Sequence, residues 1–297
     1  MQLTFFLFVG AVAAKNLTKN ILNPDIENFI WEVLTDWNSP GGQNVDGSWN
    51  VEKKGYGVAK ADGSNITEDT LFALGSNSKA SLLISNETLS PRISWKTKIA
   101  SILTRMGIVA SSQSTIIDLM SHRTGLPGHD LFYHKNQNRS SLISKIKYLR
   151  PSAEFREIFQ YSNPSYTILS YIPEVLLKIP FARYVKEHIF DPLGLNSTTY
   201  SGDVASETGN LADGFGREGI NISKNIFRSG TPRALPYWNM IGGEDGDVIS
   251  GAGGVISSAK DMVLLLQGKN PLTDEQVIPM EVIQKAASGT IVVIGDT

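Results

Sequence analysis

The sequence predicts an α+β protein with strands near both ends of the chain and helices between them. Residues 48–60 alternate between apolar and polar side chains, and Ala61-Asp62-Gly63 supplies a turn, as in a strand pair. A second β-rich run, 290–294, lies close to the end of the sequence. Strands and helices that are segregated along the chain are typical of the α+β class.

Cap and stop signals delimit the helices. Asn23-Pro24 places a cap residue before a proline at the first helical position, which predicts a helix to about residue 37. Residues 201–250 are polar and glycine-rich, and a long irregular stretch of this kind usually shapes a binding site or is partly mobile. Further helices are expected from Ser76 onward, at about 114–120 with Ser114 as its cap, at 140–149, and at 164–177 with Asn163 as its cap and Pro164 at its first position. The last expected helices lie at about 181–190, 258–265 and 280–287.

Composition narrows the function classes. The 297 residues are 41% hydrophobic and 19% charged, which suits one large globular unit or two interleaved lobes. The net charge is −2 and no basic stripe is present, so nucleic acid is not an expected partner. The chain has no cysteine, which excludes disulfides and thiolate chemistry.

The first residues predict secretion. Residues 1–14 are apolar and end in Ala11-Val12-Ala13-Ala14, which indicates a signal peptide followed by a domain over 15–297. This run is too short to span a bilayer and no later run is long enough, so no membrane anchor is expected. We therefore expect a secreted, extracellular glycoprotein. Its sequons begin at Asn16, Asn65, Asn86, Asn138, Asn196 and Asn221.

Ser76 and Lys79 form the pair with the clearest chemistry. Side chains three apart on a helix lie on one face, so the two groups can meet. A serine hydroxyl needs a base to become a nucleophile. A lysine can be that base when desolvation and the positive end of a helix lower its pKa. The backbone N–H of Ser76 is a candidate donor to an oxyanion.

The flanking sequence distinguishes this Ser-x-x-Lys pair from a chance occurrence. Gly55-Tyr56-Gly57-Val58-Ala59, then Thr70-Leu71-Phe72, precede Gly75-Ser76-Asn77-Ser78-Lys79. This order resembles the serine β-lactamase and penicillin-binding-protein superfamily, closest to its β-lactamase-related, class C-like and S12 peptidase-like branch. The resemblance implies a β-lactamase/transpeptidase-like fold, with an antiparallel sheet flanked by helices and a mostly helical lobe. Ser-x-x-Lys also occurs at Ser144/Lys147 and Ser257/Lys260, which we interpret as accidental.

The segment 119–127 also resembles the family, but its residues suggest no catalytic role. We expect His122 and Arg123 to hold the helix end and the following turn. His129 and His134 are interpreted as loop residues, because no carboxylate or third histidine lies at metal-ligand spacing. No metal or organic cofactor is implied.

The family's second motif, Tyr-x-Asn, occurs as Tyr161-Ser162-Asn163 and again as Tyr237-Trp238-Asn239. The first precedes a capped helix at a suitable distance from Ser76. By resemblance, Tyr161 is the shared acid/base group and Asn163 hydrogen-bonds near Lys79 and the substrate. A neighbouring lysine charge is expected to favour the phenolate of Tyr161, which would then accept the Ser76 proton and pass it on.

The family's third motif, Lys-Thr-Gly or His-x-Gly on a later strand, has no counterpart in the sequence. We expect the C-terminal strands to be largely missing, as in a truncated copy. In the family that strand supplies an oxyanion donor, and losing one such donor typically costs about a hundred- to thousandfold in rate.

Two interpretations follow. The first is a secreted serine hydrolase that cleaves amide or ester bonds of a small molecule or peptide through an acyl-enzyme on Ser76. The alternative is a catalytically impaired, truncated homologue or a non-enzymatic binding protein. A Ser-His-Asp esterase and a zinc hydrolase are poor candidates, since neither Gly-x-Ser-x-Gly nor His-Glu-x-x-His occurs.

Overall fold

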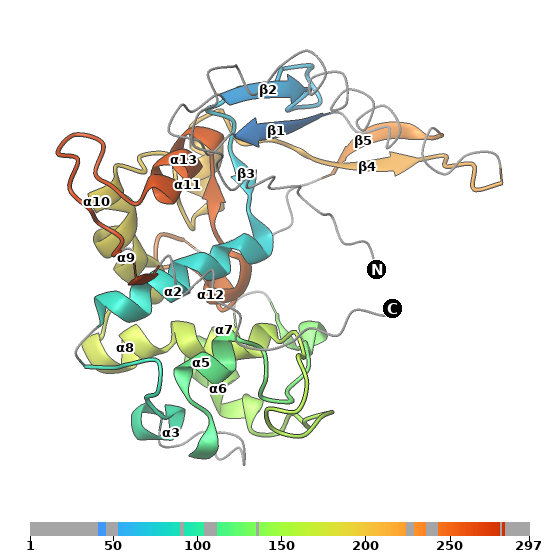
Figure 1. Cartoon of the computed structure of the whole chain (residues 1–297). Coiled ribbons are helices and arrows are strands. Elements are labelled where there is room, and N and C mark those ends of the chain that lie inside the picture. Colours follow the sequence, from blue (N-terminus) through green and yellow to red (C-terminus); the bar gives the residue numbers. More distant parts are fainter. Residues whose placement is uncertain are drawn as a thin grey trace, which may run out of the picture. The chain divides into compact units, whose positions relative to one another are not determined.

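Figure 1 shows the computed structural model of the chain. It describes residues 41–45, 53–89, 92–103, 112–134, 137–223, 229–235, 243–279 and 281–282. Several predictions lie outside these residues: the signal peptide at 1–14, the helix at 24–37, the second Tyr-x-Asn at 237–239, most of the helix at 280–287 and the strand at 290–294. Secretion, glycosylation and the absence of C-terminal strands stay predictions.

The chain forms two compact units that are interleaved in sequence. One comprises 1–72, 205–238 and 257–267, and the other comprises 73–204, 239–256 and 268–297. Within the described residues, no helix combines the length and the apolar character that crossing a membrane requires.

The first unit contains two antiparallel strand pairs (Figure 1). Strand β1 (Gly41–Val45) pairs with β2 (Lys53–Gly57), with Gly41 opposite Gly57. Strand β4 (Gly214–Glu218) pairs with β5 (Thr231–Leu235). Helix α13 (Ala259–Gln267) contacts β1. A third pair joins β3 (Phe72–Ala73) and β6 (Ile256–Ser257), two short strands through which the chain passes between units.

The strand pair predicted within 48–60 is only partly confirmed. The turn is present, because Gly63 N–H donates to the Lys60 carbonyl and Val58 bridges Asn65. The ladder partner of β2, however, is β1. Gly55 allows the close approach of this segment, since a Cβ there would lie 2.0 Å from the carbonyl oxygen of Ile66.

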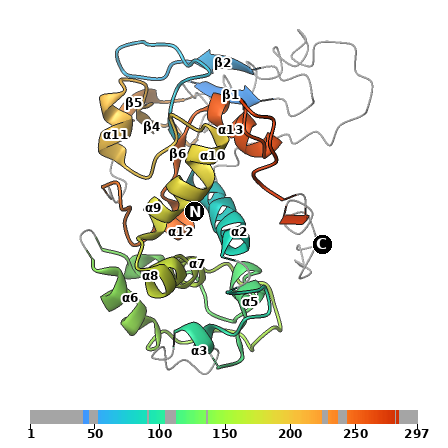
Figure 2. The ribbon, with the colours of Figure 1, turned by 90° about the vertical axis from the view of Figure 1, so that its left-hand side faces the viewer.

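The second unit is mostly helical and contains the predicted site. Helix α12 (Ser250–Gly253) packs against α2 (Lys79–Thr88) and α7 (Asn163–Ser170) (Figure 1), and it also contacts the short helix η1 (Gly75–Ser78). Helices α5 (Ile116–Met120), α6 (Arg139–Ile146) and α8 (Ile172–Leu177) surround α7 (Figure 2). Its core includes fully buried side chains such as Leu142, Leu169 and Phe181. The other helices that the structure describes in this unit are α3 (Ile99–Ile102), η2 (Asp130–Phe132), α9 (Phe181–Val185), the π-helical η3 (Lys186–Phe190) and α10 (Asp191–Leu193). Helix α11 (Gly202–Glu207) begins in this unit, and its residues 205–207 are assigned to the first unit.

The start of α7 differs from the prediction by one residue. Ser162, not Asn163, is the N-cap, and its hydroxyl accepts a hydrogen bond from Ser165 N–H. Pro164 occupies the first turn, as predicted. Because the cap is supplied by Ser162, the amide of Asn163 is available for other partners.

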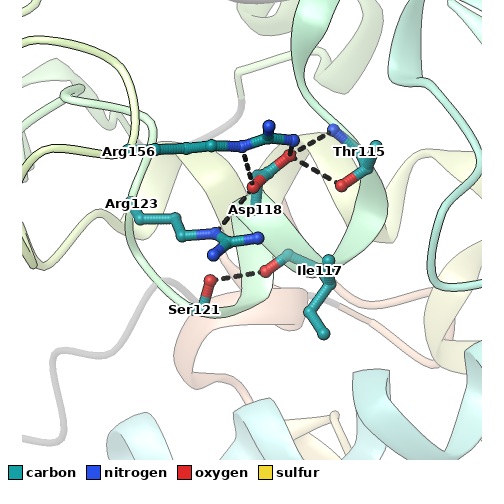
Figure 3. A network of polar contacts seen from close by, with 6 residues as sticks. All are labelled: Thr115, Ile117, Asp118, Ser121, Arg123 and Arg156. Carbon is teal, nitrogen blue, oxygen red and sulfur yellow. Dashed lines mark hydrogen bonds and ion pairs between the residues drawn. The ribbon is translucent and has the colours of Figure 1, made fainter. Parts of the chain in front are cut away.

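A buried carboxylate ties together the loops on either side of α5 (Figure 3). Asp118 is fully buried, and its Oδ1 accepts hydrogen bonds from Arg123 Nε (2.6 Å) and Arg156 Nε (2.9 Å). Its Oδ2 accepts from Arg156 Nη2 (2.8 Å) and from Thr115 Oγ1 (2.6 Å). Thr115 is also the N-cap of α5, one residue later than expected.

Backbone hydrogen bonds hold the segment 156–160, which precedes Tyr161, against the turn after α5. Arg156 N–H donates to the carbonyl of Arg123 (2.8 Å), and Gln160 N–H donates to the carbonyl of His122 (2.7 Å). Arg123 therefore holds the helix end, as predicted, and the segment that leads into Tyr161 is fastened to the turn at 122–123.

The Asp118 contacts predict an acid-sensitive contribution to stability. Burial raises the pKa of Asp118, but the hydrogen bonds from Arg156 and Thr115 and the charge of Arg123 outweigh it and hold the pKa at about 2 instead of 3.8. This difference corresponds to about 2 kcal/mol of native-state stabilisation that is complete above pH 4 and is lost as the pH falls toward 2.

We therefore expect Asp118→Asn to lower the free energy of unfolding at pH 7 by about 2 kcal/mol or more and to flatten its pH dependence between pH 4 and pH 2. Denaturant titrations across this pH range measure both effects. Asp191→Asn, which removes an exposed partner of Lys186, is the control and should leave both nearly unchanged. Wild-type stability and acid response in Asp118→Asn would contradict the assignment.

Candidate functional site

The Ser76 helix begins where the sequence predicts. Ser76 lies in η1, Lys79 is the first residue of α2, and Gly75 has a left-handed backbone (φ 51°). Two bonds anchor this turn: Leu74 N–H donates to the carbonyl of Val255, and Val255 N–H donates to Ser78 Oγ. Ser76 is exposed, whereas Lys79 is buried.

The amine of Lys79 contacts three oxygen atoms. Its Nζ lies 3.1 Å from Ser76 Oγ, 2.9 Å from Asn163 Oδ1 and 2.7 Å from the carbonyl oxygen of Ala252 in α12. Burial lowers the pKa of Lys79 to about 7, against the opposing effect of the Asp130 charge. An appreciable fraction of this lysine is therefore neutral near physiological pH.

The other two Ser-x-x-Lys pairs differ. Ser144 Oγ donates to the carbonyl of Ser141 on an exposed face of α6. Lys260 Nζ pairs with Asp69 Oδ1 (3.2 Å) in the first unit. The hydroxyl of Ser257, like that of Ser144, donates to a backbone carbonyl, that of Ser258 (3.4 Å).

Tyr161 completes the contacts of Ser76. Its hydroxyl donates a hydrogen bond to Ser76 Oγ, and Lys79 Nζ lies 4.8 Å from its ring centroid. The expectation of a favoured phenolate is wrong. Burial raises the pKa of Tyr161, an effect that the hydrogen bond with Ser76 only partly opposes, so Tyr161 is a phenol at neutral pH.

The ring of His122 packs against the ring of Tyr161. The two ring centroids are 4.5 Å apart, and His122 is buried with a left-handed backbone (φ 57°). Its Nδ1 accepts a hydrogen bond from Ser162 N–H (3.0 Å). His122 thus holds the turn, as predicted, and it also holds the catalytic candidate itself. Burial, aided by the charge of Lys79, lowers the pKa of His122 to about 4.

Asn163 bridges the lysine and a carboxylate. Its Oδ1 faces Lys79 Nζ, and its Nδ2 donates to Asp130 Oδ1 (2.7 Å). The structure therefore brings together all four predicted residues, Ser76, Lys79, Tyr161 and Asn163. Their catalytic roles stay predictions.

Sequence reasoning did not identify Ala252, Asp130 or the contact of His122 with Tyr161. Ala252 contributes a backbone carbonyl, so its side chain gives no signal. Asp130 follows His129 in a segment without a recognised motif, although a carboxylate near the family-like run 119–127 could have been considered. In the described part of the chain, no three acidic or histidine side chains gather in a group that could hold a metal ion.

Comparison with solved structures defines the class of fold. A penicillin-binding protein homologue from Pyrococcus abyssi superposes with a TM-score of 0.72 at 20% identity, covering 88% of this chain and 59% of that one. A β-lactamase/D-alanine carboxypeptidase from Pseudomonas syringae gives a TM-score of 0.63 at 22% identity, covering 86% and 68%. The fold is thus of the β-lactamase/transpeptidase type, and the α+β prediction is confirmed.

The sequence then places the chain in a particular family. The family model for beta-lactamase matches residues 40–291, and the chain belongs to the β-lactamase family. Among curated proteins, an unguisins hydrolase of Aspergillus campestris is 31% identical over 261 residues. The match covers 81% of this chain but 46% of that protein, so the chain spans less than half of the relative's length.

The contacts of His122 generate a prediction about its protonation. Because Ser162 N–H occupies Nδ1, the ring should be the neutral Nε2–H tautomer and should stay neutral down to about pH 4. Long-range ¹H–¹⁵N correlation spectra, with the His122→Gln variant for assignment, measure this directly. A proton on Nδ1, or titration at the ordinary value of 6.5, would contradict the assigned contacts.

Proposed function

We propose that the protein is a serine hydrolase that cleaves an amide or ester bond of a small molecule or peptide through an acyl-enzyme on Ser76. One observation carries the proposal: the Ser76 hydroxyl contacts both a lysine with a pKa of about 7 and a tyrosine hydroxyl. Membership of the β-lactamase family and similarity to an unguisins hydrolase support a hydrolytic reaction.

Lys79 is the proposed base. A neutral amine has two N–H donors and one lone pair, and Lys79 meets two carbonyl-type acceptors and one hydroxyl. The N–H groups donate to Asn163 Oδ1 and the Ala252 carbonyl, which leaves the lone pair directed at Ser76 Oγ. As Ser76 attacks the substrate carbonyl, its proton passes to Lys79.

Tyr161 is the proposed acid. It is a phenol that already donates to Ser76 Oγ, and 41% of its surface is exposed, so a leaving group can approach it. It gives its proton to the leaving nitrogen or oxygen as the acyl bond breaks. The ammonium of Lys79 beside its ring then stabilises the phenolate and restores the proton. In deacylation, water loses a proton to the same pair and Ser76 regains its own.

One observation favours the alternative interpretation, a homologue with impaired catalysis or a binding protein. No Lys-Thr-Gly, Lys-Ser-Gly or His-x-Gly sequence occurs in the chain, so the second oxyanion donor has no assigned residue. The backbone N–H of Ser76 is the one hydrogen-bond donor that we assign to the oxyanion.

Covalent labelling of Ser76 distinguishes the serine hydrolase from the non-catalytic alternative. We expect a fluorophosphonate, and a labelled penicillin in a parallel reaction, to modify Ser76, as mapped by mass spectrometry. The rate should rise with pH through about 7 and then level off, because the neutral form of Lys79 is the base and Tyr161 stays protonated there.

The Ser76→Ala variant should lose all labelling, whereas Ser144→Ala, in the second Ser-x-x-Lys pair, should label as the wild type does. Absence of an adduct from folded wild-type protein would favour the non-catalytic alternative. Labelling that persists in Ser76→Ala would refute Ser76 as the nucleophile.

A further inference from the structure

Asp130 is a carboxylate at the site to which the proposed mechanism assigns no role. It opens η2 directly after His129, whose left-handed backbone (φ 46°) turns the chain at this point. Its side chain is exposed, and its Oδ1 accepts the hydrogen bond from Asn163 Nδ2. Only the Asn163 amide and the Lys79 amine separate Asp130 from Ser76 along the hydrogen-bonded path.

The contact fixes the orientation of the Asn163 amide. Rotating the amide by 180° would set its NH₂ against the Lys79 amine and its oxygen against the Asp130 carboxylate, and both contacts would be lost. Asp130 therefore occupies one donor of Asn163. A substrate carbonyl cannot use that donor, and the exposed group at this position is the carboxylate of Asp130.

The second carboxylate oxygen of Asp130, Oδ2, accepts no hydrogen bond from the residues that the structure describes. It lies close to Gly128, where a Cβ would come within 3.3 Å of it. Among the described residues, no lysine, arginine or histidine forms an ion pair with Asp130. Lys79, the cation whose pKa Asp130 raises, is buried and already contacts three oxygens.

An exposed carboxylate with one free oxygen binds a protonated amine well, because such a hydrogen bond is assisted by charge. It disfavours an anionic group at the same place. When Lys79 is neutral and ready to act as a base, the cluster carries the negative charge of Asp130, which strengthens this preference.

We infer that Asp130 forms a subsite for a protonated amino group, and that the substrates are amides or esters whose acyl part carries a free amine a few bonds from the scissile carbonyl. This inference rests on the proposed function. Asp130 selects the substrate and orients Asn163; it moves no proton in the reaction.

Paired probes test the subsite without requiring turnover of a particular substrate. We would compare an aminoalkyl fluorophosphonate with its N-acetylated counterpart at pH 7.5 and measure the rate constants for labelling Ser76. In the wild type the amine should react at least about tenfold faster, and Asp130→Asn should bring the ratio close to one. This variant retains one oxygen that can accept from Asn163, removes the charge and replaces the second oxygen with an NH₂ group, which cannot bind an ammonium.

Asp191→Asn, an exposed aspartate of α10, is the matched control and should keep the wild-type ratio. A purely structural role for Asp130 would slow both probes equally and leave the ratio unchanged, which would overturn the inference. Equal reactivity of the two probes with wild-type protein would overturn it as well, while leaving the proposed function intact. Failure of both probes to label folded wild-type protein would instead refute the proposed function, and the inference with it.

Discussion

The burial of a single amine is the constraint on which the rest of the site depends. Lys79 is withdrawn from water and its Nζ contacts Ser76 Oγ, Asn163 Oδ1 and the Ala252 carbonyl. Burial opposes the charge of the amine, the nearby carboxylate of Asp130 favours it, and burial outweighs the carboxylate, which places the pKa near 7. The same lysine on an open helix face would be charged at neutral pH and could not accept a proton.

Elements far apart in the sequence maintain this balance. Helix α12 supplies the Ala252 carbonyl, and α7 supplies the amide of Asn163. The segment before α7 carries Tyr161 and is fastened to the turn at 122–123 through Gln160 and Ser162. That turn is held in its place by Asp118. A neutral His122 adds no second positive charge beside Lys79, so its low pKa is consistent with a site built around one titrating amine.

Local patterns predicted some of these features well. The i, i+3 spacing placed Ser76 and Lys79 together, and helix signals located η1, α2 and the proline-marked start of α7. Tyr161 and Asn163 could be selected only through family resemblance, because no local pattern between residues 79 and 161 predicts how the chain folds back onto Ser76. The partner of β2 was missed for the same reason, since pairing with β1 is set by tertiary structure.

The error about Tyr161 has a different origin. Considering the Lys79 charge alone predicted a lowered pKa, whereas burial of the ring dominates and raises it. The neighbours of the tyrosine ring include His122, with 4.5 Å between the ring centroids, and no sequence pattern predicts that contact. In the proposed mechanism Lys79 is the base and Tyr161 is the acid because of the environments of the two side chains, which lower one pKa and raise the other.

Titration of Lys79 itself is the decisive experiment on the proposed base. Protein carrying ¹³C-labelled lysine would be followed by NMR from pH 5 to pH 11, with the Lys79→Arg variant identifying the resonance by its loss. Because the amine is buried, we expect this lysine to titrate at about 7. A midpoint at its ordinary value of 10.5 would show that Lys79 remains charged at neutral pH, and would remove the base from the proposed reaction.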